Sequence, residues 1–507
     1  MDTTKQELIA KIESRVADKA LERSNADLLI KLINNADSID EAISIAALGT
    51  MYKRTGLHFD PRLEKMSNTI KYFEKNEVLS FTTPGAKRTH KLIIGDNYDA
   101  LQNLLIQYKG KIDVIYIDPP YGKDSMGEFA DTNYDNAITR DNLLSMLYPR
   151  LVLAKQLLSQ SGIIFCSIDD KNQAYVKCLF DEVFGEKNFV ACLIWQKRKG
   201  GGNDSVYVGT DHEYILVYVK QKEPNPERWR VPYEPEYLKR YKFSDEKGLY
   251  YYDTLSRPGL QNPIVYDVQC PDGSIIKNGT WQISKDTFDA GIKSGEVDFI
   301  KNKEGGYTVV RKVRVPEEGK VFRSIITNVS NKDAADEMES LFKNKKEFSN
   351  PKPIYLLQQL LNLPKLPESA VILDFFAGSG TTGHAVLDLN RLKGNKTFIL
   401  CQMNEITDTN PNGIAYDVTS KRLKRIMTGE CYDGSKDFEW IKKNKPYGDN
   451  LDVYEIKMVA DNAQEVGQTP FDLIDETLYG KEKFASKREK IEWVCQNFQR
   501  TEKYLEE

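Results

Sequence analysis

The stretch Ile-Asp-Val-Ile-Tyr-Ile-Asp-Pro-Pro-Tyr at residues 112–121 decides the fold. Its first six residues form a compact run rich in β-branched side chains, which is typical of a strand buried on both faces of a parallel sheet. Asp118 then stands at the carboxyl end of that strand. Ligands bind at this end of the strands in open α/β sheets, so the sequence predicts a functional site that contains Asp118 and Tyr121.

A second motif follows far downstream. The apolar run at residues 371–373 leads into a glycine-rich turn, Asp-Phe-Phe-Ala-Gly-Ser-Gly-Thr-Thr-Gly, at residues 374–383. Because each motif comes at the end of a strand-like run, we expect both on the same rim of one parallel sheet, although a long stretch of chain separates them. The pair, with the tetrad Asp-Pro-Pro-Tyr first, indicates methylation of an amino group on a nucleobase.

Helical and strand-like patterns alternate around the two motifs, which predicts an α/β domain. Strands are expected at residues 92–94, 162–166 and 398–400, with edge strands at 190–195 and 213–219, and helices at 143–158 and 176–184, the last of which ends at Gly185. From about 221 to 345 the pattern changes to short β-like pieces and turns, so an inserted, mostly β module is expected there. Both ends of the chain are expected to be helical.

Length and composition limit the class of protein. The 507 residues suffice for two or three domains, and a composition of 40% hydrophobic and 29% charged residues predicts a soluble protein without a membrane span. The first residues lack a signal-peptide pattern, so a cytoplasmic location is expected. Seven scattered cysteines without a C-x-x-C pair predict reduced thiols and no metal site. Because the net charge is −4, any DNA-binding face must be locally basic.

The glycine-rich turn admits more than one ligand. Gly378, Gly380 and Gly383 fit the dinucleotide fingerprint, and Glu405 stands where a ribose-binding carboxylate is expected, so a nicotinamide enzyme is one alternative. Asp374 would repel a pyrophosphate but suits a cationic ligand. S-adenosylmethionine (AdoMet) carries a positive sulfonium and no phosphate, which favours it. A strand-turn-helix junction without any ligand is the third possibility.

The tetrad at 118–121 favours the methyl-transfer interpretation. An exocyclic amine of adenine or cytosine is a poor nucleophile because its lone pair is delocalised into the ring. A fixed carboxylate and a backbone carbonyl that accept its two N–H groups expose that lone pair, and Pro119 and Pro120 hold the backbone rigid. Tyr121 offers a ring on which a base taken out of the helix can stack. The structural alternative is a strand that ends in a proline turn.

These motifs in this order resemble the β-class amino-methyltransferases of bacterial DNA modification, over roughly 88–220 and 345–430. In that family a D-P-P-Y tetrad usually accompanies adenine-N6 methylation, and S-P-P-Y accompanies cytosine-N4 methylation. More narrowly, Tyr148-Pro149-Arg150, Ser167–Asp170 and Asp211–Tyr214 resemble the modification (Mod) subunits of type III restriction systems. Similar wording occurs in type II methyltransferases, and the chain is shorter than many Mod subunits.

The resemblance implies a Rossmann-like methyltransferase fold, a mixed seven-stranded sheet in permuted order, with AdoMet as cofactor. It implies five segments: a helical N-terminal arm (1–87), the catalytic half of the core (88–220), an inserted target-recognition domain (221–345), the AdoMet-binding half (346–445) and a C-terminal extension (446–507). The residues implied for the target base are Asp118, Pro119, Pro120 and Tyr121. Those implied for AdoMet are Asp374, Phe376, Ala377, Gly378, Gly380, Thr381, Glu405, Phe348, Lys352 and Asp96.

Several of these assignments have structural alternatives. Phe348 and the Pro-Lys-Pro segment at 351–353 can simply begin a helix, and Asp96 can be a turn residue. The basic loop Lys197–Lys199 suits DNA phosphates but also a solvated hairpin tip. His212 and Glu213 are interpreted as a structural pair at a strand start rather than as an acid/base dyad.

The sequence thus predicts an AdoMet-dependent adenine-N6 methyltransferase that acts on a flipped base in double-stranded DNA. The resemblance implies a Mod dimer, with cleavage left to a separate helicase-nuclease subunit, because this chain has no G-x-x-x-x-G-K-[ST] loop. The alternatives are a type II or solitary methyltransferase, including one for cytosine-N4, and a non-catalytic AdoMet-sensing DNA-binding subunit.

Overall fold

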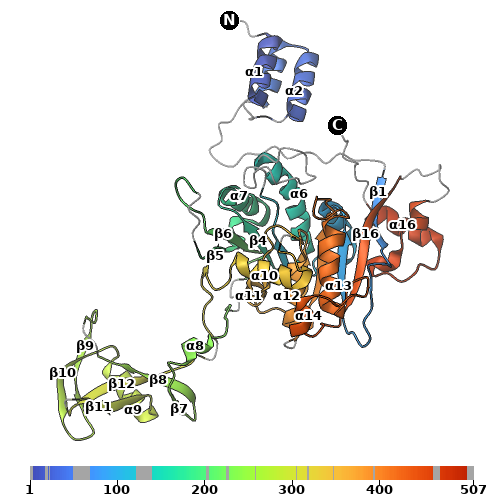
Figure 1. Ribbon diagram of the computed structural model, residues 1–507. Coiled ribbons are helices and arrows are strands. Elements are labelled where there is room, and N and C mark those ends of the chain that lie inside the picture. Colours follow the sequence, from blue (N-terminus) through green and yellow to red (C-terminus); the bar gives the residue numbers. More distant parts are fainter. Residues whose placement is uncertain are drawn as a thin grey trace. The chain divides into compact units, whose positions relative to one another are not determined.

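The computed structural model describes residues 4–17, 21, 23–48, 69–121, 140–200, 205–223, 228–256, 259–303, 305–316, 319–345, 347–391, 394–460 and 469–498. The chain divides into two compact units (Figure 1). The larger unit comprises residues 1–226 and 324–507, and the smaller unit comprises residues 227–323.

A mixed sheet of ten strands forms the centre of the larger unit, in the order β1-β16-β2-β15-β14-β3-β4-β6-β5-β13. All neighbouring strands from β16 to β4 run parallel, and β6 runs antiparallel to both β4 and β5. The strands are β1 (Thr69–Lys75), β2 (Thr89–Ile94), β3 (Ile112–Ile117), β4 (Leu158–Ile168), β5 (Phe189–Gln196), β6 (His212–Val219), β13 (Ile325–Ile326), β14 (Val371–Asp374), β15 (Thr397–Gln402) and β16 (Asn450–Ala460).

The order of the strands is permuted relative to the chain. β14 and β15 come late in the sequence but lie between β2 and β3. β14 pairs in parallel with β3, with Leu373 opposite Ile115, so both strands end on the same rim of the sheet. This confirms the predicted α/β fold and the common rim of the two motifs. The seven strands from β2 to β5 correspond to the predicted seven-stranded sheet.

Three further strands extend that sheet, and two of them correct the sequence prediction. β1 lies inside the predicted helical arm, and β16 lies in the predicted C-terminal extension. The two strands pair antiparallel, with Phe73 opposite Ile456, and β16 joins the edge of β2 in parallel. Both form strands because their apolar side chains, such as Phe73 and Tyr454, are buried in the core there.

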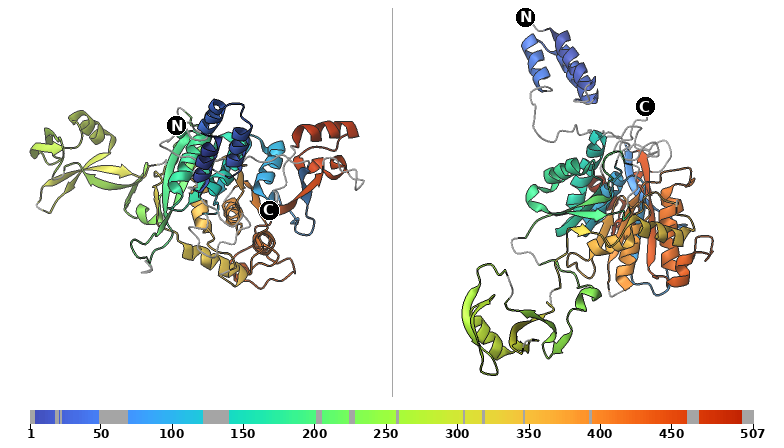
Figure 2. Two further views of the ribbon diagram at one scale, coloured as in Figure 1. Left: turned by 90° about the horizontal axis from the view of Figure 1, so that it is seen from above. Right: turned by 60° about the vertical axis from the view of Figure 1, so that its left-hand side comes forward.

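Helices cover both faces of the sheet (Figure 1 and Figure 2). On one face α4, α6 and α7 pack side by side, and on the other α11, α12 and α13 do so. The helices of this unit, after the N-terminal three, are α4 (Asn97–Tyr108), α6 (Arg140–Leu157), α7 (Gln173–Phe184), α10 (Asn331–Phe342), α11 (Ile354–Leu361), α12 (Thr381–Arg391), α13 (Lys421–Thr428), α14 (Glu439–Lys443), α15 (Pro470–Leu473) and α16 (Lys487–Asn497), with short turns η2 (Glu186–Asn188), η3 (Ala415–Ser420) and η4 (Glu476–Tyr479). As predicted, α7 ends at Gly185, whose φ is +89°.

Three helices form the predicted helical start of the chain: α1 (Lys5–Ala17), α2 (Arg23–Asn35) and α3 (Ile39–Leu48). They pack on each other around their own apolar cluster, which includes Ile12, Ile33 and Ala42. None of the helices in the described part of the chain is long and apolar enough to cross a membrane.

The smaller unit is β-rich and has its own core. It contains α8 (Pro235–Leu238), β7 (Phe243–Asp245), β8 (Gly248–Thr254), β9 (Ile264–Gln269), β10 (Ile275–Trp281), α9 (Lys285–Ser294), β11 (Val297–Lys301) and β12 (Tyr307–Arg314). Four strands form a sheet in the order β11-β12-β8-β7, and β9 and β10 form a separate hairpin. Trp281, Phe288 and Val309 pack together at the centre.

The end of the inserted module differs from the prediction. Residues 324–345 were expected to belong to the insert, but they lie in the larger unit. β13 extends the main sheet by pairing with β5, and α10 buries Met338 against Ile414 and Val418. The insert therefore ends about twenty residues earlier, because this helix needs the larger core to cover its apolar face.

Candidate active site

The tetrad that follows β3 forms a compact turn at the rim of the sheet. The Tyr121 hydroxyl donates to Oδ1 of Asp118 at 2.7 Å. The side-chain amide of Asn172, just before α7, donates to the backbone carbonyl of Tyr121 at 2.8 Å. These two bonds set the direction in which the Asp118 carboxylate and the Tyr121 ring point. The residues that follow, 122–139, lie outside the described part of the chain.

Lys352 binds the second carboxylate oxygen of Asp118. Its ammonium donates to Oδ2 of Asp118 at 2.8 Å and to the Tyr121 hydroxyl at 3.1 Å. The residue lies just before α11, and 8% of its side chain is exposed. The family resemblance implied Lys352 as an AdoMet-binding residue. In the structure its ammonium lies at the carboxylate of the tetrad, 234 residues away along the chain.

Glu213 completes the cluster, and sequence reasoning missed it. Its Oε2 lies 3.1 Å from the Lys352 ammonium and accepts from the Tyr121 hydroxyl at 3.2 Å, while Oε1 accepts from Lys197 at 2.9 Å. His212 does not pair with it, since its ring nitrogen lies 3.8 Å from Asp170. The two residues begin β6 and form no acid/base dyad, as expected, but the expected pairing of their side chains with each other is wrong. The sequence did contain a sign of this role: Glu213 lies in a strand that is mostly apolar, and a carboxylate buried there needs a cationic partner.

Lys197 also differs from its prediction as a phosphate contact. Its ammonium is turned inward to Glu213, with a fifth of its side chain exposed. Its two neighbours, Arg198 and Lys199, are exposed. Of the three predicted phosphate contacts, Arg198 and Lys199 thus keep exposed side chains.

Burial and charge shift the pKa values of this cluster in opposite directions. Burial raises the pKa of Asp118, and the neighbouring Glu213 charge raises it further, against Lys352, which lowers it. Burial would raise the pKa of Glu213 too, but Lys352 and Lys197 outweigh it and hold that pKa below its usual value. Burial lowers the pKa of Lys352, but the two carboxylates outweigh it and raise the pKa. Glu213 is thus the firmly charged carboxylate, and Asp118 is the better proton acceptor.

The glycine-rich turn follows β14, the strand beside β3. Gly378 and Gly380 have φ angles of +51° and +80°, which favour glycine. A Cβ on Gly378 would lie 3.0 Å from the ring of Phe348. The Gly378 N–H donates to Gln402 at 2.7 Å, and the Gly380 N–H donates to the carbonyl of Ala377 at 2.8 Å. The turn is tight, and the Phe348 ring stands over it.

The buried side chain of Asp374 stabilises this turn through hydrogen bonds. It is 2% exposed, and its two oxygens accept from the Phe376 N–H at 3.0 Å and from the Thr382 hydroxyl. Burial raises the pKa of Asp374 to about 7, although the two hydrogen bonds lower it. The predicted contact of Asp374 with a cationic ligand stays a prediction.

The remaining predicted cofactor residues lie around the turn or near it. Thr381 begins α12, and its hydroxyl accepts from the buried Arg422 at 3.0 Å. Glu405 follows β15, and burial raises its pKa. Within the described residues, no side chain or backbone group donates to its carboxylate. Asp96 has structural partners, since it caps α4 by accepting from the Tyr98 N–H at 2.7 Å and pairs with Arg150 at 3.0 Å.

The comparison with protein families places this site in a known group. The sequence model of the N6_N4_Mtase family, described as DNA methylase, matches residues 112–409, which is more than half of the chain. The chain belongs to this family of DNA methylases. The match begins at β3 and ends after Glu405, so it includes both motifs of the candidate active site. A second family model, of an uncharacterised conserved protein, matches residues 5–114.

Three relatives of the chain carry functional names. The StyLTI Mod subunit of a type III restriction-modification enzyme of Salmonella typhimurium is 34% identical over 360 residues, which cover 64% of this chain and 54% of that protein. The EcoP15I Mod subunit of Escherichia coli is 27% identical, with 79% and 71% covered. The type II methyltransferase M.KpnI of Klebsiella pneumoniae is 29% identical, with 75% and 97% covered. The chain thus spans about half of one Mod subunit and nearly all of M.KpnI.

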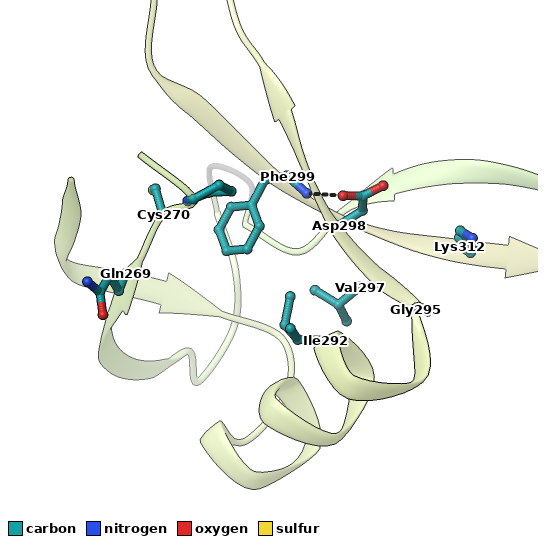
Figure 3. A pocket seen from close by; sticks show the side chains of 9 residues that line it. Gln269, Cys270, Ile292, Gly295, Val297, Asp298, Phe299 and Lys312 are labelled. Carbon is teal, nitrogen blue, oxygen red and sulfur yellow. Dashed lines mark hydrogen bonds between the residues drawn. The ribbon is translucent and has the colours of Figure 1, made fainter. Parts of the chain in front are cut away.

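The smaller unit has a hollow of its own, of about 550 Å³ (Figure 3). It opens between α9 and β11 and is lined by Gln269, Cys270, Pro271, Ile292, Gly295, Val297, Asp298, Phe299 and Lys312. The Asp298 carboxylate accepts from the Phe299 N–H at 2.8 Å, and Lys312 is bound by Asp245 at 2.9 Å. None of the residues of either motif lines this hollow, so it is separate from the candidate active site.

Proposed function

We propose that the chain is a site-specific DNA methyltransferase that uses AdoMet to methylate N6 of an adenine flipped out of double-stranded DNA. One observation carries this proposal. The tetrad with Asp118 and the glycine-rich turn with Gly378 lie at the ends of two adjacent parallel strands, β3 and β14. A target amine and a methyl donor bound at these two turns would meet at one rim of the sheet.

In the proposed reaction the tetrad at residues 118–121 orients the amino group of the target base. The Asp118 carboxylate and the backbone carbonyl of Pro119 accept its two hydrogens, so that the nitrogen lone pair is released from the ring and directed at the methyl group. The Tyr121 ring stacks on the flipped base. The ammonium of Lys352, 5.4 Å from the centre of that ring, keeps the Tyr121 hydroxyl and the Asp118 carboxylate in place.

The turn after β14 fits AdoMet. A Cβ on Gly378 would lie 3.0 Å from the Phe348 ring, so glycine lets the backbone of the turn lie close beside an aromatic ring that could stack on a flat ligand. The half-buried carboxylate of Glu405 has acceptor oxygens for the ribose hydroxyls. Asp374 adds negative charge under the cationic end of the cofactor. When bound, AdoMet supplies an activated methyl group on its sulfonium.

The choice of base rests on the first residue of the tetrad. Asp118 makes a D-P-P-Y tetrad, which favours adenine-N6 as the target. Cytosine-N4 is the second candidate, because the matching family model covers both N6 and N4 methylases.

DNA contact is assigned to the loop between β5 and β6 and to the inserted unit. The loop begins beside the active-site cluster at Lys197 and carries the exposed Arg198 and Lys199. Farther along it, Val206, Tyr207 and Val208 are 89%, 95% and 83% exposed. Cationic side chains suit the phosphates, and exposed apolar ones suit the gap that a flipped base leaves in the stack. The inserted unit serves as the target-recognition domain.

The relatives favour a role in a restriction-modification system. We infer that the chain is a type III Mod subunit, because two of the three relatives above are Mod subunits. The family resemblance then implies a homodimer with a separate helicase-nuclease subunit as partner. A type II methyltransferase is the second candidate, favoured by the 97% coverage of M.KpnI.

The decisive experiment is single-molecule sequencing of genomic DNA from a methylation-free host that expresses the wild type or Asp118→Ala. Asp170→Ala, at an exposed carboxylate, is the matched control. We expect an N6-methyladenine motif with the wild type and the control but not with Asp118→Ala. Methylation of one strand only supports the type III assignment, and an N4-methylcytosine motif supports the second base. If the wild type leaves no motif although equilibrium dialysis shows AdoMet bound, the proposal is wrong.

A further inference from the structure

One ammonium group lies between two carboxylates at the centre of the candidate active site. Lys352 is 2.8 Å from Asp118 and 3.1 Å from Glu213, and the side chains of Lys352 and Glu213 are each only 8% exposed. Lys197 approaches Glu213 from the other side at 2.9 Å. The family tetrad accounts for Asp118 and Tyr121, but the roles of Glu213 and of its two lysines are not yet explained.

The cluster contains equal numbers of negative and positive side chains, and Glu213 supplies the second negative charge. Asp118 and Glu213 carry two negative charges, and Lys352 and Lys197 carry two positive ones. Without Glu213, the Lys352 ammonium would have Asp118 as its remaining carboxylate partner of the two. A carboxylate that holds a buried ammonium group alone is a poor proton acceptor, because its charged form is strongly stabilised.

The position of Glu213 follows from the sheet. β6 runs antiparallel to β4, with Tyr214 opposite Ile168, so the first residues of β6 lie at the same rim as the end of β4. Side chains alternate along a strand, so Glu213 and His212 face opposite sides. Glu213 thereby reaches the Tyr121 hydroxyl at 3.2 Å, while His212 points to Asp170.

We propose that Glu213 is a positioning residue that shares the Lys352 ammonium with Asp118 and so leaves Asp118 able to accept first a hydrogen bond and then a proton from the target amine. This inference rests on the proposed function. In the reaction the bond between sulfur and the methyl carbon breaks as a bond between the amine nitrogen and that carbon forms. The nitrogen then carries a positive charge, its N–H bond breaks, and the proton passes to the Asp118 carboxylate.

The proposal predicts opposite pH shifts for two variants. The groups that face Asp118 are Lys352, Glu213, Tyr121, Tyr116, Asp374 and Cys166. Glu213→Gln removes a negative charge, which lowers the pKa of Asp118. Lys197→Met removes one of the two ammonium groups that bind Glu213. Glu213 then attracts the Lys352 ammonium more strongly, away from Asp118, and the pKa of Asp118 rises. Methyl transfer requires an ionised Asp118, so the acidic limb of the rate profile moves to lower pH in the first variant and to higher pH in the second.

The measurement is the single-turnover rate of methyl transfer to unmethylated genomic DNA, with enzyme and labelled AdoMet in excess, between pH 5 and 9. We expect each limb to move by about one pH unit, since a charge a few ångströms away shifts a pKa by that order. Glu213→Gln is also expected to lower the plateau rate, because a weaker base accepts the proton less readily. His212→Asn, next to Glu213 on the opposite face of β6, is the matched control and should keep the wild-type profile.

The outcomes separate this inference from the proposed function. AdoMet binding by the full chain, measured by calorimetry, checks that each variant is folded, and Lys197→Met replaces Glu213→Gln as the test if the latter does not fold. If the wild type methylates and both limbs stay in place, Glu213 has only a structural role and the inference is wrong. If the wild type transfers no methyl group, the proposed function and this inference fail together.

Discussion

At the scale of single residues, the carboxylates at the two strand ends have different tasks that burial alone does not distinguish. Asp374 has both oxygens engaged by its own turn, whereas Asp118 is engaged by Tyr121 and by a distant lysine. Burial raises the pKa of both. The difference lies in their partners: those of Asp374 belong to its own turn, whereas Asp118 also pairs with Lys352 from a distant part of the chain.

The pKa of Asp374 leads to a prediction about cofactor affinity. That pKa is raised by burial to about 7 in the free protein, and a bound cation would lower it. Binding of AdoMet should therefore release a proton below pH 7. We expect the affinity for AdoMet to rise as pH increases from 5.5 to about 7, by at most about tenfold per pH unit for one linked proton, and then to level off.

Isothermal titration with AdoMet across this pH range tests the prediction. Asp374→Asn cannot ionise and should bind more weakly with little pH dependence. Equal pH dependence in the wild type and in Asp374→Asn would mean that another group is responsible.

At the scale of elements, the turn between β14 and α12 depends on glycine. Gly378 has a φ of +51° and faces Phe348 at 3.0 Å from a virtual Cβ, so Gly378→Ala combines backbone strain with a steric clash. We expect it to destabilise the protein by about 1–2 kcal/mol or more and to weaken AdoMet binding. Gly434→Ala is the matched control, because Gly434 has a φ of +79° with open space around it. Chemical denaturation and AdoMet titration of both variants distinguish strain from loss of the cofactor site, and equal effects on AdoMet binding would contradict the role of this turn.

A buried arginine ties the same turn to the helices around it. Arg422 of α13 donates to Ser379 and Thr381 at 3.0 Å each and lies 3.7 Å from Glu337 of α10. Glu337 in turn accepts from the N–H of Ile354 at 3.1 Å, two residues after Lys352.

We expect Arg422→Met to lower the free energy of unfolding by about 3–5 kcal/mol, because it leaves buried polar partners unpaired. Lys442→Met, which removes an exposed pair with Glu439, should leave it nearly unchanged. Urea denaturation compares the two, and similar losses would contradict the special role of Arg422.

The loop between β5 and β6 yields a prediction about DNA binding. Arg198→Gln with Lys199→Gln removes two exposed charges and should reduce the slope of log affinity against log salt by about 2. The double variant Lys187→Gln with Lys222→Gln, at the opposite end of β5, is the control and should keep the slope. Fluorescence anisotropy with a duplex at several salt concentrations measures both, and an unchanged slope in the first variant would remove this loop from the DNA contact.

At the scale of the whole molecule, sequence patterns predicted the strands that have a clear local pattern and missed the contacts between distant segments. β3 and β14 were predictable because each is a continuous apolar run with a motif at its end. β1 and β16 were not, because each is interrupted by charged residues and is stabilised as a strand by pairing with distant segments: β1 with β16, and β16 with β2 as well. The Lys352–Asp118 contact joins residues 234 positions apart, and no pattern along the chain indicates such a pair.

The division into two units leads to a prediction about specificity. All predicted cofactor residues belong to the larger unit, and the smaller unit has a separate core. Replacement of residues 227–323 by a short glycine-serine linker should therefore leave AdoMet binding unchanged and abolish methylation of a defined motif. Calorimetry with AdoMet and sequencing of host DNA measure the two properties. Retention of the same motif by the shortened protein would show that the insert does not read the sequence.

The permuted strand order also affects how the chain is made. β2 and β3 are synthesised close together, but in the finished sheet β14 and β15 separate them. Until residue 402 has left the ribosome, the nascent chain lacks the two central strands and has two open edges at its middle. Filling this interior gap joins strands over a large sequence separation, which slows folding. The strands that close the gap carry the glycine-rich turn, so a nascent chain joins the two halves of its sheet and forms this part of its proposed cofactor site in the same event, before β16 is added at the edge of β2.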